Sequence, residues 1–124
     1  MSHSVNGKQL AQARPDNTNA VSVYAPDTAD MATEIRMINI ANTTGSAATF
    51  RLFHDEDGTT YDETTALFFD KSIAANDSFT EAYEEGAIWM RNTSGNLAFR
   101  TGTNNALTIT IYGIEHFDTV GVIN

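Results

Sequence analysis

The chain has 124 residues, no cysteine and a formal net charge of −9, because 16 Asp and Glu stand against only 7 Lys and Arg. This length favours one domain, which can bury roughly two thirds of its unfolded surface without disulfide bonds. The composition excludes disulfides and cysteine-ligated metal sites. The acidic charge argues against nucleic-acid and anionic-membrane partners, since affinity for both comes mainly from Lys and Arg.

The first 19 residues are polar and predict an N-terminal arm that becomes ordered only against something else. Within it, Gln9–Ala13 is the one stretch that could form a short strand, and Leu10 is its candidate interface residue. The arm has no apolar run of the roughly 7–15 residues found in a signal peptide. We therefore expect the protein to be made in a cytoplasm and to stay outside the secretory route.

From residue 20 onward, apolar and polar residues alternate with a period of two. In Leu107–Tyr112, the residues Leu107, Ile109 and Ile111 share one face, which is typical of a half-buried antiparallel strand. Ala48–Phe53 repeats this pattern, with Phe53 on the outward face. The predicted strands are Ala20–Tyr24, Glu34–Ala41, Ala48–Phe53, Leu67–Ile73, Ser78–Tyr83, Ala87–Arg91, Leu97–Thr101 and Leu107–Tyr112.

Turn segments rich in Asn, Asp and Gly separate these strands, because these residues tolerate positive φ or cap their own backbone. About eight short strands at a spacing of roughly 8–12 residues predict a β-sandwich, a jelly roll or a small barrel. We predict an all-β fold: a single antiparallel, jelly-roll-like β-sandwich over residues 20–115.

The last segment, residues 116–124, is apolar although the final strong strand has ended. An apolar end on a short chain often pairs with or packs on a neighbouring subunit. Its apolar residues are therefore candidate interface residues: Phe117, Val120, Val122 and Ile123. The alternative is that this tail forms a final edge strand of the same sheet.

The strongest acidic feature is Asp55–Glu63, which holds five carboxylates in nine residues. Asp55, Asp57 and Glu63 resemble part of a calcium loop, since Ca²⁺ binds six to eight oxygens. The spacing does not complete an EF-hand, because Gly58 follows Asp57 directly. A solvated hairpin loop is the favoured interpretation, and a cation site is the alternative.

No arrangement of catalytic residues is evident. The three histidines, His3, His54 and His116, are scattered and predict no three-histidine zinc site. The chain has no Gly-x-Ser-x-Gly elbow, and Ser46 lies in a turn without a nearby histidine. The acids of residues 81–85 end a strand and begin a turn, as solvated charges commonly do. We predict no enzymatic activity, no catalytic residues and no cofactor.

Two aromatic residues, Trp89 and Tyr112, are candidate interface residues. Trp89 lies in Ala87–Arg91, so either Ile88 and Met90 face inward and Trp89 faces outward, or the reverse. If Trp89 and Tyr112 both face outward, the domain presents an adhesive face. The alternative is that Trp89 fills the core beneath a hairpin.

The order of six segments resembles a family of small virion structural proteins of tailed bacteriophages. These segments are Ile38–Asn42, Ala48–Phe53, Asp55–Tyr61, Ile73–Phe79, Asn96–Thr101 and Leu107–Glu115. The resemblance covers about residues 20–115 and leaves out the tail after Glu115.

This resemblance implies a β-sandwich without catalysis that is attached to the virion, often as a capsid decoration or cement protein. The implied partners are other virion proteins, the major capsid protein above all, and further copies of the chain in a homo-oligomer such as a trimer. Assembly in the host cytoplasm is expected. The alternative is a receptor- or glycan-binding module of a tail or fibre that uses Trp89, Tyr112 and the loop Asp55–Glu63.

Overall fold

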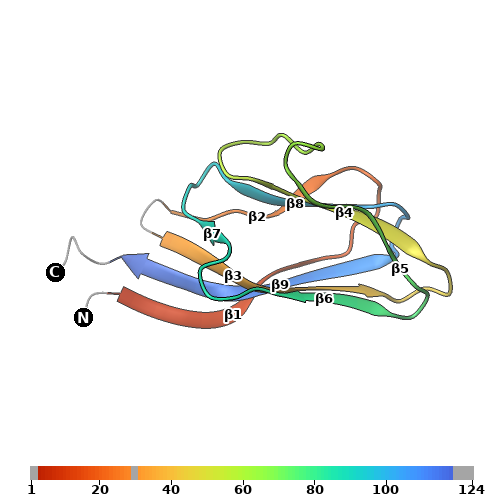
Figure 1. Ribbon diagram of the computed structural model, residues 1–124, viewed down its shortest axis with the longest axis horizontal. Helices are drawn as coiled ribbons and strands as arrows, with labels where there is room; N and C mark the ends of the chain where they lie inside the picture. Colours follow the sequence, from red (N-terminus) through yellow and green to blue (C-terminus); the bar gives the residue numbers. More distant parts are fainter. Residues whose placement is uncertain (1–2, 29–30, 119–124) are drawn as a thin grey trace.

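The computed structural model describes residues 3–28 and 31–118, which form nine strands and no helix (Figure 1). In chain order the strands are β1 (His3–Ala13), β2 (Val21–Tyr24), β3 (Met31–Asn42), β4 (Ala48–Asp55), β5 (Ala66–Ile73), β6 (Ser78–Ala82), β7 (Trp89–Met90), β8 (Asn96–Thr101) and β9 (Leu107–Asp118).

The strands form two antiparallel sheets that pack face to face. Sheet A has the order β1-β9-β3-β6, with β7 also paired to β3, and sheet B has the order β2-β8-β4-β5. The pairs are nested along the chain, because β1 pairs β9, β2 pairs β8, β3 pairs β6 and β4 pairs β5. A long hairpin rolled up in this way produces two four-stranded sheets. The fold is a jelly roll.

The predicted all-β, jelly-roll-like sandwich is confirmed, and strands β2 to β9 each overlap a predicted strand. The N-terminal segment differs from its expectation as an arm, because His3–Ala13 forms β1 and pairs with β9 along its whole length. A bulge at Leu10 shifts the pairing register by one residue and interrupts the alternation of polar and apolar residues. A period-of-two pattern is therefore not visible in this strand.

The C-terminal segment also differs from its expectation. β9 continues to Asp118 and lies between β1 and β3, so residues 116–118 belong to a central strand, not to a tail or an edge strand. Residues 119–124, which include Val120, Val122 and Ile123, lie outside the described residues.

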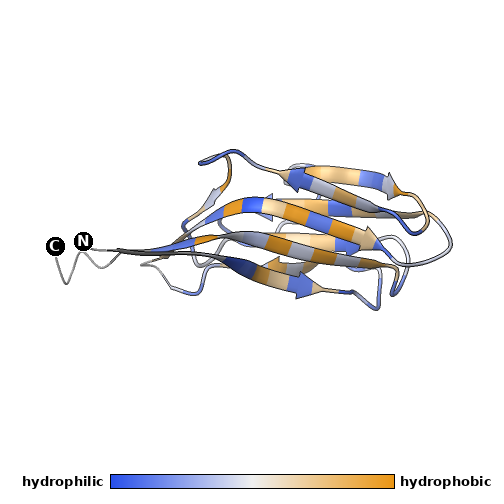
Figure 2. Ribbon diagram, turned by 90° about the horizontal axis from the view of Figure 1, so that it is seen from below, coloured by the Kyte–Doolittle hydropathy of each residue, from blue (hydrophilic) through white to orange (hydrophobic). Residues whose placement is uncertain are grey.

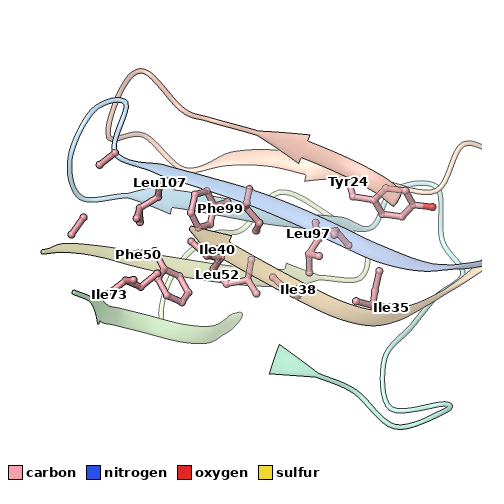
Figure 3. Close-up of a cluster of buried hydrophobic side chains, with 14 of the residues drawn as sticks. Tyr24, Ile35, Ile38, Ile40, Phe50, Leu52, Ile73, Leu97, Phe99 and Leu107 are labelled. Carbon is pink, nitrogen blue, oxygen red and sulfur yellow. The ribbon is translucent and has the colours of Figure 1, made fainter. Parts of the chain in front are cut away.

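The core lies between the two sheets (Figure 3). β3 and β9 contribute fully buried aliphatic side chains, and the expected inward residues Leu107, Ile109 and Ile111 are all buried. Phe50 of β4 is the centre of the aromatic contacts, with its ring 5.6 Å from that of Phe79 and 5.9 Å from that of Phe99. These contacts hold sheets A and B together and leave two outward faces for other roles.

Candidate functional site

The outer face of sheet A is the candidate functional site. It is built from the outward positions of five strands, which alternate with the buried core positions. Its main residues are Gln9 and Gln12 of β1, Met37 and Asn39 of β3, Thr80 of β6, Trp89 of β7, and Thr108, Thr110, Tyr112 and Ile114 of β9. Seen from below the ribbon of Figure 1, the strands show bands of hydrophobic and hydrophilic residues (Figure 2).

Tyr112 lies at the centre of this face between two β-bulges. On one side β1 bulges at Leu10, and on the other β3 bulges at Arg36, both next to the residues that pair with Tyr112. β-Bulges redirect side chains and are common beside functional positions. The side chain of Tyr112 is 40% exposed, and that of Met37 beside it is 37% exposed. The bulges therefore surround a prominent aromatic side chain.

An open hollow of about 540 Å³ adjoins Tyr112. Arg36, Gln9 and Ile114 contribute side chains to its lining, and Gly7 leaves space where a side chain would otherwise stand. The lining combines apolar surface with two cationic residues, Lys8 and Arg36. Apolar surface beside cationic groups is a combination found at protein interfaces, where aromatic residues and Arg are enriched.

A buried carboxylate anchors the region next to the hollow. Glu34 of β3 points outward but is only 2% exposed, because the segment that follows β6 folds over it. Its Oε2 accepts a hydrogen bond from the backbone N–H of Gly86 at 2.6 Å, and its Oε1 lies 3.5 Å from Nε2 of His116. A buried carboxylate with these partners holds the loop before β7 in one position. The sequence did not identify this residue, because the bulge at Arg36 disrupts the alternation in β3.

Trp89 lies on the outer face, and its neighbour Met90 fills the core. The indole ring is 5.0 Å from the His116 ring and 4.8 Å from the Arg91 guanidinium group. The side chain is half-buried by these contacts. Trp89 and Tyr112 therefore share the outer face of sheet A, but Trp89 is partly covered by its own chain.

The other predicted interface residues take different positions. Leu10 packs against the core beneath β9, near Gly113, and this inward side chain is not part of the outer face. Phe117 is paired within β9, opposite Met31 of β3. Val120, Val122 and Ile123 lie outside the described residues, so their predicted interface role stays a prediction.

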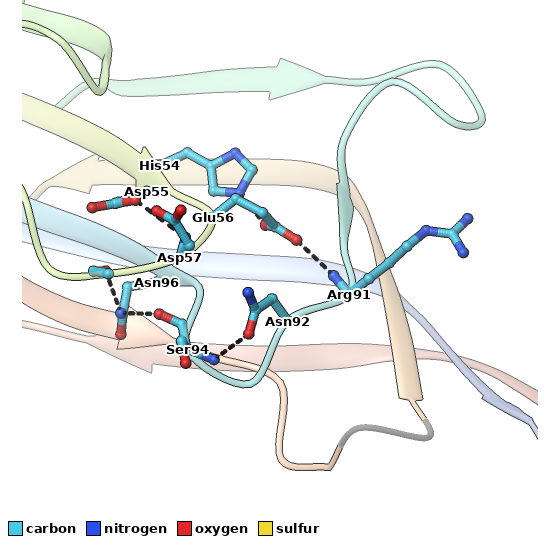
Figure 4. Close-up of polar contacts among 9 residues, drawn as sticks. His54, Asp55, Glu56, Asp57, Arg91, Asn92, Ser94 and Asn96 are labelled. Atoms are coloured by element: carbon cyan, nitrogen blue, oxygen red, sulfur yellow. Dashed lines mark hydrogen bonds and ion pairs between the residues drawn. The ribbon is translucent and has the colours of Figure 1, made fainter.

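The acidic loop after β4 is held by its own hydrogen bonds (Figure 4). The Asp55 carboxylate accepts the backbone N–H groups of Thr60 at 2.8 Å and Asp57 at 3.2 Å, which lowers the pKa of Asp55. Glu56 accepts the backbone N–H of Arg91 at 2.9 Å. Among the described residues, no three His, Asp or Glu side chains come together in a way that could hold a metal ion. Asp55 is thus a turn-forming residue in this structure.

A second group of polar residues lies at the end of the sandwich and joins β1, β2, β3 and β9. The Tyr24 hydroxyl is 2.5 Å from Oγ1 of Thr33 and donates to Oε2 of Glu115 at 3.3 Å. Lys8 completes the cluster, with its Nζ 2.7 Å from Oε1 of Glu115. Burial raises the pKa of Tyr24 to about 12, and the Glu115 carboxylate adds to this effect. These groups pair with one another and connect the four strands.

Comparison with known proteins leaves the family open. No protein-family model matches the chain, and no curated protein matches it either. Among solved structures, two of the Tobacco streak virus coat protein, one of them described as a dimer, are each 9% identical to this chain, with a TM-score of 0.46. The matches cover 99% of this chain and 91% and 89% of the two coat-protein chains. The jelly-roll assignment rests on the strand pairing alone.

The described residues contain no helix that could cross a membrane.

Proposed function

We propose that this chain is a non-enzymatic structural protein of a virus particle, and that it decorates and reinforces a bacteriophage head. The outer face of sheet A binds the particle, with Tyr112 at the centre of the contact. The observation that carries this proposal is that the described part of the outer face of sheet A bears no exposed carboxylate, although the chain has a net charge of −9. Interfaces are depleted of charge at their centre and enriched in aromatic residues.

The distribution of acidic residues supports the same orientation. Five carboxylates lie in Asp55–Glu63 and three more lie in residues 81–85, so half of the 16 acidic residues lie in these two segments, at strand ends and turns. On the outer face of sheet A, Glu34 is the buried exception, and it is compensated by the Gly86 N–H and by His116. Solvated acidic loops at the ends of the sandwich keep the protein soluble, and the face without exposed carboxylates is left for protein contact.

The fold and the resemblance both support a virion role. Jelly rolls occur in viral capsid proteins and in lectin domains, so the fold alone does not assign a function. The six segments that resemble small phage virion proteins correspond to strands β3, β4, β8 and β9 and to turns around them. We propose the major capsid protein as the main partner, and assembly in the host cytoplasm.

The decisive experiment is quantitative mass spectrometry of purified virions that contain this chain. Hundreds of copies per particle, in a fixed ratio to the major capsid protein, support a decoration protein of the shell. A dozen copies or fewer would place the chain in the tail or portal. Absence from purified virions would refute the virion role altogether.

Binding to the particle tests the proposed face. Tyr112→Ala should weaken co-sedimentation with particles that lack this protein by roughly 30-fold, since an aromatic residue central to an interface contributes about 2 kcal/mol. Phe69→Ala is the matched control, because Phe69 is similarly exposed, at 42%, but lies on sheet B. Equal binding of both variants and the wild type would refute the role of sheet A.

The residues beyond β9 provide a second contact in this proposal. The apolar residues Val120, Val122 and Ile123 follow β9 and would pack on a neighbouring subunit, together with Phe117 at the end of that strand. A chain that ends at Asp118 should keep its folded domain and bind particles more weakly. Unchanged particle binding and oligomeric state would show that these residues make no contact.

A glycan-binding module of a tail or fibre is the second candidate. The exposed ring of Tyr112 beside an open hollow favours it, because sugars stack on exposed aromatic rings. The contacts of Trp89 with His116 and Arg91 leave less of the indole ring free. Glycan-array binding that is lost in both Tyr112→Ala and Trp89→Ala would favour this function over decoration of the head.

A further inference from the structure

We infer that strand β1 is a docking edge at which a second copy of this chain adds its own β1, joining the two A sheets into one continuous sheet. This inference goes beyond the proposed function, because such a dimer can form whether or not the protein is a virion component. The partner is an identical chain, and the contact is made by backbone hydrogen bonds along the strand.

β1 is a long strand with an open side. It has eleven residues, stands at the end of sheet A and, among the described residues, pairs only with β9 (Figure 1). Alternate N–H and C=O groups of such a strand point away from the sheet and can pair with another strand. Gly7, Lys8 and Gln9 are exposed.

The other three sheet edges carry features that discourage pairing. β2 has only four residues. β5 contains Asp70 at a positive φ of 54° and the charged Lys71 beside it. β6 has five residues and includes Glu81, with Asp77 directly before the strand. Short length, charge and backbone irregularity are the devices by which edge strands avoid association.

β1 has few of these features, although the chain is strongly acidic. It contains no acidic residue and no proline in its eleven residues. Its one cation, Lys8, is used within the chain, because its Nζ forms an ion pair with Glu115 at 2.7 Å. The bulge at Leu10 is the single irregularity, and it leaves the seven residues His3–Gln9 in continuous register with β9. This stretch is long enough for an edge-to-edge contact.

The edges of the chain point to a second copy as the occupant, because β1 is a long edge strand without acidic residues and the matching edge on another copy is its own β1. Two chains with a net charge of −9 repel each other, so they can approach only where acidic groups are absent. A two-fold axis at Asn6 would place Ser4 opposite Lys8 of the second copy, and His3 opposite Gln9. No like charges would face each other in this arrangement, and both chains would use the same surface, as a two-fold dimer requires.

Hydrogen exchange on the full chain locates the contact. As the protein concentration rises, backbone amides of residues 3–9 should become more protected, and the outer amides of β5 and β6 should not change. Sedimentation equilibrium of the same samples should show a dimer. A monomer at all concentrations, or protection that does not depend on concentration, would overturn the inference.

Two neighbouring proline substitutions give a matched test. Consecutive N–H groups of a strand point to opposite sides, so one of Ser4→Pro and Val5→Pro removes a free-edge donor and the other removes a donor to β9. The variant that lacks the donor on the free edge should keep the unfolding free energy of the wild type. Its dimer should lose one hydrogen bond from each chain, which raises the dimer dissociation constant about tenfold.

The outcome separates this inference from the proposed function. Tyr112→Ala should leave the dimer intact, because Tyr112 is on the sheet face and not at its edge. A dimer that survives both proline substitutions but dissociates in Tyr112→Ala would overturn the β1 contact and assign dimerisation to the outer face. Loss of the dimer in one proline variant, with unchanged particle binding, would leave both proposals standing as separate contacts.

Discussion

The two outer faces of the sandwich are built from the same type of strand, but they differ in how an outward aromatic residue near the middle of each is treated. On sheet B, Phe53 points outward and is nevertheless 1% exposed, and the ring of Tyr61 from the loop after β4 lies 6.1 Å from its ring. On sheet A, Tyr112 points outward and is 40% exposed. An outward apolar residue can thus be covered by another part of its own chain or stay exposed for a partner.

Charge separates the two faces further. On sheet B, Arg51 hydrogen-bonds both carboxylate oxygens of Asp70, and its guanidinium carbon lies 3.8 Å from the centre of the Phe69 ring. On sheet A, Gln12 donates a hydrogen bond to Thr110, and Thr80 donates one to Asn39. On sheet B the interaction joins two charged side chains, whereas these hydrogen bonds on sheet A join neutral side chains.

The largest expected effect tests the coverage of sheet B. Phe53→Ala should lower the free energy of unfolding by about 3–5 kcal/mol, because it removes a fully buried ring and leaves a cavity beneath the loop. Leu67→Ala on the same sheet, where Leu67 is 42% exposed, should change it by less than about 1 kcal/mol. Denaturant unfolding measures both values. Similar losses in the two variants would show that the loop does not seal this face.

A smaller effect tests the construction of sheet A. A methyl group on Gly113 would overlap the backbone carbonyl oxygen of Glu34 and approach the Leu10 side chain at 2.7 Å. Gly113→Ala should therefore cost roughly 1–3 kcal/mol of unfolding free energy, as overpacking does. Gly7→Ala is the matched control, because a methyl group there meets nothing within 4 Å. A neutral Gly113→Ala would mean that the strands beside Tyr112 adapt freely.

The smallest effect is a pH dependence confined to sheet B. Hydrogen bonds from Arg51 hold the pKa of Asp70 below its usual range. The stabilisation is then complete above the ordinary Asp pKa of about 3.9 and is lost as the pH falls through the lowered folded-state pKa. Asp70→Asn, which also tolerates positive φ, should be less stable than the wild type near neutral pH.

Stability curves measured across acidic pH check this expectation. The difference between the wild type and Asp70→Asn should shrink as the pH falls below about 4, the ordinary range of Asp. Tyr112→Ala on sheet A should show the wild-type pH profile. A difference between Asp70→Asn and the wild type that stays constant with pH would mean that the ion pair contributes nothing to stability.

Parts of the candidate site were predictable from the sequence. The outward position of Tyr112 follows from the alternation in Leu107–Tyr112, because Ile109 and Ile111 must face the core. For Trp89 the pattern left two orientations open, and Met90 takes the core position. Glu34 could not be identified, since its burial depends on a loop more than 50 residues later, at Gly86.

Strands β2 to β9, most of their inward and outward faces and the turns between them follow from the sequence, because a period of two is a local property of the chain. Tertiary structure alone decided that His3–Ala13 is a strand, that Phe53 is covered and that bulges flank Tyr112. Each of these outcomes depends on which distant segment lies alongside. Pairing partners, coverage and bulges are set by contacts across the fold, and these leave no periodic signal in the sequence.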